Sequence, residues 1–178
     1  MKAIQYSSYG GVAGMALVDA RKPEPGADEV LVRVRASGVN PVDIAVSEGH
    51  LAAMMPLTFP VTAGSEIAGD IEICGANVRG FADGDAVHAV IGICGAFAEY
   101  AVVKTSAVAR KPTRMSYVEA AGLPIAATTA TAALNAGTVG PGVKLFVHAA
   151  ARRRRLRAGA NGEGPGRRSH RRGVLGKH

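Results

Sequence analysis

The sequence contains no tryptophan, only 4% aromatic residues and only two cysteines, Cys74 and Cys94. Two cysteines are too few for a disulfide scaffold or a four-cysteine zinc knot, and such low usage is typical of a reducing compartment. The first segment, Met1 to Asp19, also lacks the basic start, apolar run and small-residue cleavage site of a secretory signal peptide. These absences argue against a secreted, disulfide-rich protein, and we expect a cytoplasmic one.

Long hydrophobic runs are absent as well. The stretch from Ala120 to Val143 carries no charge, but glycine, proline, threonine and asparagine residues interrupt it. A membrane-spanning helix needs about 20 predominantly apolar residues in succession. We therefore expect a protein that has no membrane partner.

Acidic residues are scarce near the C-terminus, and this decides how the net charge is interpreted. The 178 residues carry 21 Lys and Arg against 14 Asp and Glu, a formal net charge of +7. Residues 152–178 hold ten of the basic side chains and one acidic side chain, Glu163, which puts that segment at +9 and leaves residues 1–151 at −2. The sequence predicts a mildly acidic body, long enough for one complete core, and a basic tail of the composition typical of disorder.

Short apolar segments separated by glycine and proline turns follow one another over residues 1–110. Between Glu29 and Ala36, valines alternate with Leu31, Arg33 and Arg35, which predicts a half-buried strand. Further strands or extended segments are expected over 1–6, 56–60, 67–74, 86–91 and 97–103, with a loop over 75–84. Many short strands with glycine turns indicate a mainly β, barrel-like domain.

The pattern changes further along the chain. Ser116 and Glu119 have the spacing of a capping box, which predicts the start of a short helix. Pro124 predicts a break, and Ala126 to Ala136 predicts a second helix rich in alanine and threonine. Val143 to His148 is a short apolar run of the kind that forms a buried parallel strand. A strand that follows a helix is how an α/β domain begins.

Six short segments within residues 1–151 stand in a particular order and approximate spacing. They are Gly38 to Asp43 (GVNPVD), Gly64 to Gly69 (GSEIAG), Phe81 to Val87 (FADGDAV), Gly95 to Tyr100 (GAFAEY), Ala121 to Ala126 (AGLPIA) and Val147 to Ala151 (VHAAA). Together they resemble the medium-chain dehydrogenase/reductase superfamily, and within it the zinc-free quinone oxidoreductases.

The resemblance implies a GroES-like β-barrel domain over 1–122, the first helix and strand of an incomplete Rossmann domain over 123–151, and a tail over 152–178. It also implies NADPH and substrate in the cleft between the two domains, with hydride transferred to quinones or α,β-unsaturated carbonyls. The zinc-dependent branch carries a cysteine in the position of Asn40 and a histidine in that of Ser65, so no zinc is expected here.

Three residues are carried over from the resemblance, none of them with an assigned catalytic role. Asn40 matches a position that lines the nicotinamide and substrate cleft, where its amide can donate to a carbonyl oxygen. Thr129 matches a threonine near the nicotinamide end, and His50 falls where relatives often have an aromatic or polar cleft residue. Each has a structural alternative, because Asn40 before Pro41 can begin a turn, Thr129 can be an ordinary helix residue and His50 a surface histidine.

Other chemically active side chains have simpler interpretations. Asp43 and Glu66 resemble a catalytic pair of carboxylates, but structural hydrogen bonding within the barrel is favoured. His88 is expected to be a strand histidine. Cys74 and Cys94 are expected to be small, buried apolar residues.

The glycine-rich turn that binds a dinucleotide is missing where the family has it. After Ala151 the family continues with Gly-Gly-Val-Gly and a helix, whereas Arg152 to Arg155 follow here. Side chains prevent the close approach of backbone to pyrophosphate that glycine allows. A GC-rich back-translation of residues 152–178, read one base later, encodes Gly-Gly-Val-Gly-Ser-Val-Gln and meets no stop. A frameshift is therefore one hypothesis for the tail, beside a truncation and a genuine basic extension.

The sequence thus predicts an NADPH-dependent, zinc-independent quinone or enone reductase, of which this chain is an N-terminal portion with little activity alone. The resemblance also implies homodimers, which relatives form largely through the part of the Rossmann domain that is missing here. An alternative of a different class is a non-catalytic barrel module whose basic tail binds nucleic acid or another polyanion without sequence specificity. A third is an inactive barrel that pairs with an intact relative.

Overall fold

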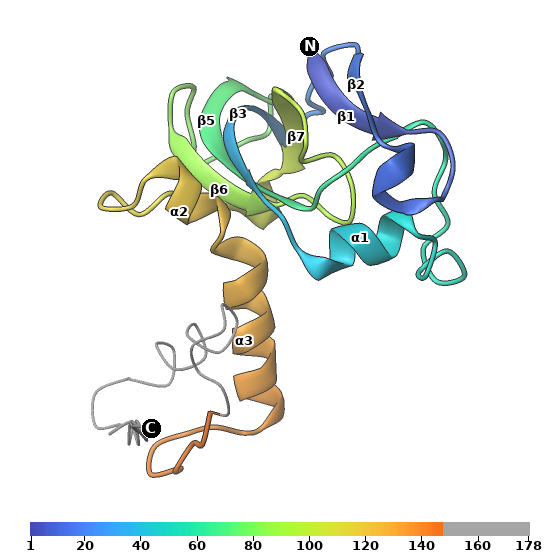
Figure 1. Ribbon diagram of the computed structural model, residues 1–178. Helices are drawn as coiled ribbons and strands as arrows, with labels where there is room; N and C mark the ends of the chain where they lie inside the picture. Colours follow the sequence, from blue (N-terminus) through green and yellow to red (C-terminus); the bar gives the residue numbers. More distant parts are fainter. Residues whose placement is uncertain (148–178) are drawn as a thin grey trace, which may run out of the picture. The chain divides into compact units, whose positions relative to one another are not determined.

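The computed structural model describes residues 1–147. The chain divides into two compact units after Pro124 (Figure 1). The predictions about Ala149 to Ala151 and about residues 152–178, including the basic tail and its reading frame, lie outside the described residues.

The first unit consists mainly of short strands, as the sequence predicts. The strands are β1 (Lys2–Tyr6), β2 (Ala16–Asp19), β3 (Glu29–Gly38), β4 (Val61–Thr62), β5 (Glu66–Cys74), β6 (Ala86–Val90), β7 (Tyr100–Lys104) and β8 (Val108–Arg110). The helices of the described residues are η1 (Gly11–Gly14), α1 (Pro41–Ser47), η2 (Thr105–Ala107), α2 (Tyr117–Ala121) and, mostly in the second unit, α3 (Pro124–Ala136).

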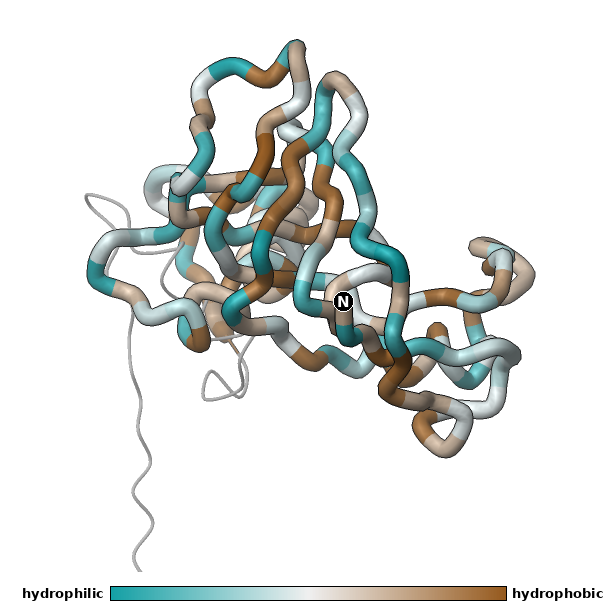
Figure 2. The backbone as a smooth tube through the Cα atoms, turned by 90° about the horizontal axis from the view of Figure 1, so that it is seen from above, coloured by the Kyte–Doolittle hydropathy of each residue, from teal (hydrophilic) through white to brown (hydrophobic). Residues whose placement is uncertain are grey.

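The strands form two antiparallel sheets. One has the order β2-β1-β4 and the other the order β7-β3-β5-β6-β8. Along the strands hydrophobic residues alternate with hydrophilic ones (Figure 2). The inward side chains of the larger sheet form the main core around Val30, Val32, Ile67, Ile71 and Val87. The two sheets meet through Ala3 and Ala98, which form an isolated antiparallel bridge.

The strand β3 confirms the alternation read from the sequence, with one addition. Val30, Val32 and Val34 pack in the main core, and Arg33 is exposed. Leu31 points to the other face but is also buried, so the start of the strand is covered on both sides. Irregular pairing with β5 interrupts the register after Leu31 and after Val34.

The segment expected to form a strand over 97–103 is shorter than predicted at its beginning. The strand β7 starts at Tyr100, because Phe97 and Ala98 pair instead with the smaller sheet. The Phe97 carbonyl accepts a hydrogen bond from the Ile4 N–H at 2.8 Å. This crossing connects the two sheets. The segment from Pro56 to Pro60 contains no strand and precedes β4.

The short helix α2 begins with the predicted capping box. The Ser116 hydroxyl accepts a hydrogen bond from the Glu119 N–H at 3.2 Å, and the Glu119 carboxylate accepts one from the Ser116 N–H at 2.8 Å. These contacts satisfy N–H groups that have no partner inside the helix. Ala120 and Ala121 then pack against Ala68 of β5, which fixes α2 on the larger sheet.

The helix α3 begins at Pro124, which fits the first turn of a helix because its missing N–H would have no partner there. The strand predicted over Val143 to His148 is wrong for its described part: Val143 to Val147 form no strand, and Phe146 is 87% exposed. A buried parallel strand obtains its backbone hydrogen bonds from neighbouring strands. Among residues 125–147 no such neighbour exists.

Candidate functional site

The clearest polar feature of the first unit is a group of buried side chains. Asn40, Asp43, Ser65 and Glu66 are each 5% exposed or less, and hydrogen bonds join them. We call these four residues the buried polar cluster. It contains one of the three residues carried over from the resemblance, Asn40, and both carboxylates that the sequence singled out.

Two elements bring the cluster together. Asn40 is separated from the end of β3 by Val39 and is the N-cap of α1, with an extended backbone (φ −129°, ψ 155°) as expected before Pro41. Asp43 lies one turn into α1. Ser65 and Glu66 stand at the start of β5, where Glu66 pairs with the last residue of β3. The turn between β3 and α1 thus lies next to the beginning of β5.

Each carboxylate of the cluster accepts hydrogen bonds. Asp43 accepts from the Asn40 backbone N–H at 2.6 Å and from the Ser65 hydroxyl at 2.5 Å. Glu66 accepts from the Asn40 side-chain amide at 2.9 Å. Buried carboxylates require such partners, because an unpaired charge in the interior is costly. The structural hydrogen bonding expected of Asp43 and Glu66 is confirmed.

Aromatic residues and a thiol adjoin the cluster. The Tyr6 hydroxyl lies 3.7 Å from the Cys94 Sγ, and Phe59 contacts the rings of both Tyr6 and Tyr9 edge-on. Burial raises the pKa of Tyr6 well above its usual range, and the Cys94 thiol and the negative charge of Asp43 add to this. Burial likewise raises the pKa of Cys94. Both groups are therefore neutral at physiological pH. Cys94 is only partly buried and contacts a hydroxyl, so it differs from the buried apolar residue expected.

His88 is a half-buried residue of β6, in agreement with the strand histidine expected. Its Nδ1 lies 3.4 Å from the Ala120 carbonyl oxygen, across to α2. Burial lowers the pKa of His88, while the Ala120 carbonyl and the charge of Glu66 act in the opposite direction. His88 therefore links β6 to α2.

The other two residues carried over from the resemblance are not members of the cluster. His50 follows α1 at the surface, with its Nδ1 3.5 Å from Glu48, as its structural alternative describes. Thr129 is an exposed residue of α3 and belongs to the second unit. Their contacts with substrate and nicotinamide stay predictions.

Two of the four side chains of the cluster are poor zinc ligands. Asn40 and Ser65 offer an amide and a hydroxyl, whereas zinc prefers thiolate, imidazole and carboxylate ligands. Among the described residues no group of three or more His, Cys, Asp or Glu side chains is arranged to hold a metal ion. Within residues 1–147, no helix combines the length and the apolar character that crossing a membrane requires.

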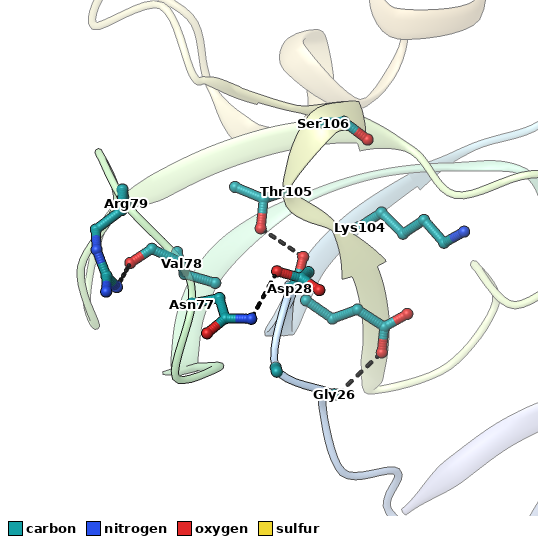
Figure 3. A pocket seen from close by; sticks show the side chains of 10 residues that line it. Gly26, Asp28, Asn77, Val78, Arg79, Lys104, Thr105 and Ser106 are labelled. Atoms are coloured by element: carbon teal, nitrogen blue, oxygen red, sulfur yellow. Dashed lines mark hydrogen bonds between the residues drawn. The ribbon is translucent and has the colours of Figure 1, made fainter.

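A surface hollow lies elsewhere on the unit, between the turn before β3, the loop after β5 and the beginning of η2 (Figure 3). Asp28 occupies its middle: its carboxylate accepts from the Asn77 amide at 3.1 Å, and its carbonyl accepts from the Thr105 hydroxyl at 2.7 Å. Lys104 and Arg79 add positive charge at its rim. Residues of the buried polar cluster do not line this hollow.

The sequence missed two features of the site. Gly38 belongs to the segment GVNPVD, but its close packing against Glu66 depends on the pairing of β3 with β5, which the segment does not record. The contact between Tyr6 and Cys94 joins residues 88 positions apart, and no local pattern marks it.

Comparison with known proteins agrees with this architecture. Residues 26–113 match the family model of the alcohol dehydrogenase GroES-like domain. A chloroplastic quinone-oxidoreductase homolog of Spinacia oleracea is 40% identical over 137 residues, which are 75% of this chain and 42% of that protein. The quinone oxidoreductase of Sus scrofa is 36% identical over 152 residues, 84% of this chain and 46% of that protein. The chain thus spans less than half the length of these relatives.

Solved structures show the same likeness. The quinone oxidoreductase of Coxiella burnetii superposes with a TM-score of 0.73 at 30% identity, over 80% of this chain and 46% of that one. The human synaptic vesicle membrane protein VAT-1 homolog-like protein gives a TM-score of 0.80 at 30% identity, over 89% and 50%. Mycobacterial Rv1454c, solved in complex with NADPH, gives 0.77 at 30% identity, over 89% and 48%.

Fold and comparisons together define the class: a GroES-like domain followed by the beginning of a Rossmann-like part, as the sequence predicts. The chain belongs to the medium-chain dehydrogenase/reductase superfamily, and its relatives there are quinone oxidoreductases.

Proposed function

We propose that this chain is the substrate-facing portion of a zinc-independent, NADPH-dependent reductase of quinones or α,β-unsaturated carbonyls. The observation that carries the proposal is the held amide of Asn40, at the position where zinc-dependent members of the superfamily have a metal ligand. A fixed amide can donate to a carbonyl oxygen without a metal, and negative charge develops on that oxygen during reduction. The names of the relatives and the NADPH complex of one neighbour support the substrate class and the cofactor.

The residues fit the two ends of NADPH unequally. Asn40 and, in the second unit, Thr129 supply polar groups of the kind that bind a nicotinamide, whose chemistry when bound is hydride transfer. The phosphates require backbone N–H groups reached through a glycine turn, and the sequence has Arg152 to Arg155 where that turn would stand. Calorimetry with NADPH is expected to show no micromolar binding, and clear micromolar binding would contradict this part of the proposal.

The substrate side can be tested without NADPH. Duroquinone carries four methyl groups on its ring, so it does not readily alkylate the two thiols. In ¹⁵N-correlated NMR spectra of the whole chain, duroquinone is expected to shift the side-chain amide signals of Asn40. Asn40→Ala should abolish the duroquinone-induced shifts of the neighbouring backbone N–H signals, whereas Asn77→Ala, which changes a surface amide, should keep them. Shifts confined to other regions would refute the proposed role of Asn40.

The remaining expectations belong to the same proposal. The described cysteines, Cys74 and Cys94, are free, which agrees with a reducing, cytoplasmic location.

The frameshift hypothesis for residues 152–178 is tested by the coding nucleotides. It predicts that restoring one base after codon 151 yields a glycine-rich turn, and a restored frame without that turn would refute it.

A second candidate function rests on one observation, the ten basic side chains of residues 152–178. Such a segment binds polyanions electrostatically, with an affinity that falls steeply as salt rises. Gel shifts with double-stranded DNA should show this salt dependence, and deletion of residues 152–178 should abolish it. Binding with the same salt dependence after the deletion would show that residues 152–178 are not the DNA-binding segment.

A further inference from the structure

Glu66 is the most deeply buried ionisable residue in the site, with no exposed surface. A carboxylate in such a place is costly unless hydrogen bonds compensate it. It sits where β3 ends, and a side chain on Gly38 would occupy the same space. The fold therefore reserves room for this carboxylate beside Asn40.

The Glu66 carboxylate determines which end of the Asn40 side-chain amide faces it. An ionised carboxylate only accepts hydrogen bonds, whereas an amide has one donating and one accepting end. Glu66 Oε1 therefore selects the orientation in which Nδ2 of Asn40 faces β5, at 2.9 Å. Nδ2 carries two N–H groups, so the same contact also sets the direction of its other N–H, the one that the proposed function assigns to a carbonyl oxygen.

The backbone of Asn40 is held by a second carboxylate. Its N–H donates to Asp43, which also accepts from the Ser65 hydroxyl. Asn40 is thus held at its backbone from α1 and at its side chain from β5. Two independent anchors leave little rotational freedom to a side chain, and a preorganised amide loses less entropy when a ligand binds.

We propose that Glu66 is a positioning residue for Asn40: its carboxylate fixes the orientation of the amide that meets the carbonyl group of a quinone or enone. The proposal rests on the proposed function, because it takes Asn40 as the group that contacts the ligand. Glu66 itself is not expected to touch the ligand or to exchange a proton with it.

The first test measures the contact itself in the unaltered chain. Asn40 side-chain signals are assigned by their loss in Asn40→Ser. With ¹⁵N and ¹³C labelling, a scalar coupling across the hydrogen bond is expected between Asn40 Nδ2 and the Glu66 carboxyl carbon. Slow exchange of the donated proton with solvent is expected as well. A rapidly exchanging amide without this coupling would overturn the proposal.

The second test uses Glu66→Gln, which preserves shape but can present either end of its amide. The single pair of Asn40 side-chain signals should shift or split into two, and the affinity for duroquinone should fall by up to about tenfold. Glu72→Gln is the matched control, since it makes the same change on the same strand outside the cluster. Asn40 signals unchanged by Glu66→Gln would overturn the proposal.

The two proposals fail differently. If duroquinone leaves the Asn40 signals of the unaltered chain unmoved, the proposed function of Asn40 fails, and with it the ligand-directed role of Glu66. If duroquinone binds equally well to the unaltered chain and to folded Glu66→Gln, only the positioning role fails. Should Glu66→Gln not fold, the coupling measured in the unaltered chain still decides the contact.

Discussion

Gly38 and Glu66 are directly paired across β3 and β5, and the Glu66 carboxylate occupies the space that a Cβ on Gly38 would need. The Ala121 carbonyl oxygen of α2 lies 2.7 Å from the same point. The glycine is therefore required by packing, since two neighbouring elements converge on it. It links the end of β3, the buried polar cluster and α2.

Replacement of Gly38 by alanine should consequently destabilise the fold. The methyl group would force the Glu66 side chain or the backbone of α2 to move, and such overpacking typically costs about 1–3 kcal/mol. Urea unfolding followed by circular dichroism measures this change. Gly14→Ala is the control, because nothing lies within 4 Å of its Cβ position. Equal stability of the two variants would contradict the packing role.

Asp43 and Ser65 should be energetically coupled. Asp43→Asn weakens acceptance from two buried donors, and Ser65→Ala removes one of them. Each change is expected to cost about 1–3 kcal/mol, and the double variant should cost less than both together. A double-mutant cycle in urea measures the coupling. Strict additivity would show that the short contact contributes nothing to stability.

The lowered pKa of His88 predicts a loss of stability on mild acidification. Because burial disfavours the charged ring, the unfolded chain binds the proton more readily than the folded one. The stabilising effect of neutral His88 is complete above the ordinary histidine value of 6.5 and is lost as the pH falls from there through the lower folded value. The unfolding free energy should therefore decrease between pH 7.5 and 5.5, and His88→Gln should reduce that slope. An identical slope in both proteins would contradict the assignment.

The contact between Tyr6 and Cys94 should control the reactivity of the thiol. Burial raises the pKa of Cys94, and the hydrogen bond from Tyr6 partly offsets this by stabilising the thiolate. Tyr6→Phe should therefore slow alkylation by iodoacetamide at pH 8, since the thiolate is the reactive form. The rate is measured by mass spectrometry in a Cys74→Ser background. Tyr9→Phe keeps the contact and serves as the control, and faster alkylation in Tyr6→Phe would contradict the prediction.

Much of the first unit could be predicted locally. Alternating valines marked β3, and the spacing of Ser116 and Glu119 marked the start of α2, because both signals depend on neighbouring residues. The run from Val143 failed for the converse reason. An apolar segment is a strand only when others pair with it, and residues 125–147 supply none.

The candidate site, too, could be predicted from the sequence only in part. The motif around Asn40 pointed to a functional position, and the choice of Asn40 and Ser65 indicated chemistry without zinc. The partners of the amide came from strand pairing that no local pattern records, between segments 26 residues apart. His50 and Thr129 were chosen by the same kind of resemblance, and neither lies in the buried polar cluster.

By itself, the sequence determined the family, the mainly β architecture and the charge boundary near residue 151. The order of motifs, the alternation of apolar residues and the local composition can all be read from the sequence without knowledge of the fold. The tertiary structure decided what Asn40, Asp43 and Glu66 do for one another. Hydrogen bonds in a buried site depend on distances of about 3 Å between groups from different elements. Only the pairing of β3 with β5 and the turn into α1 bring those groups within reach.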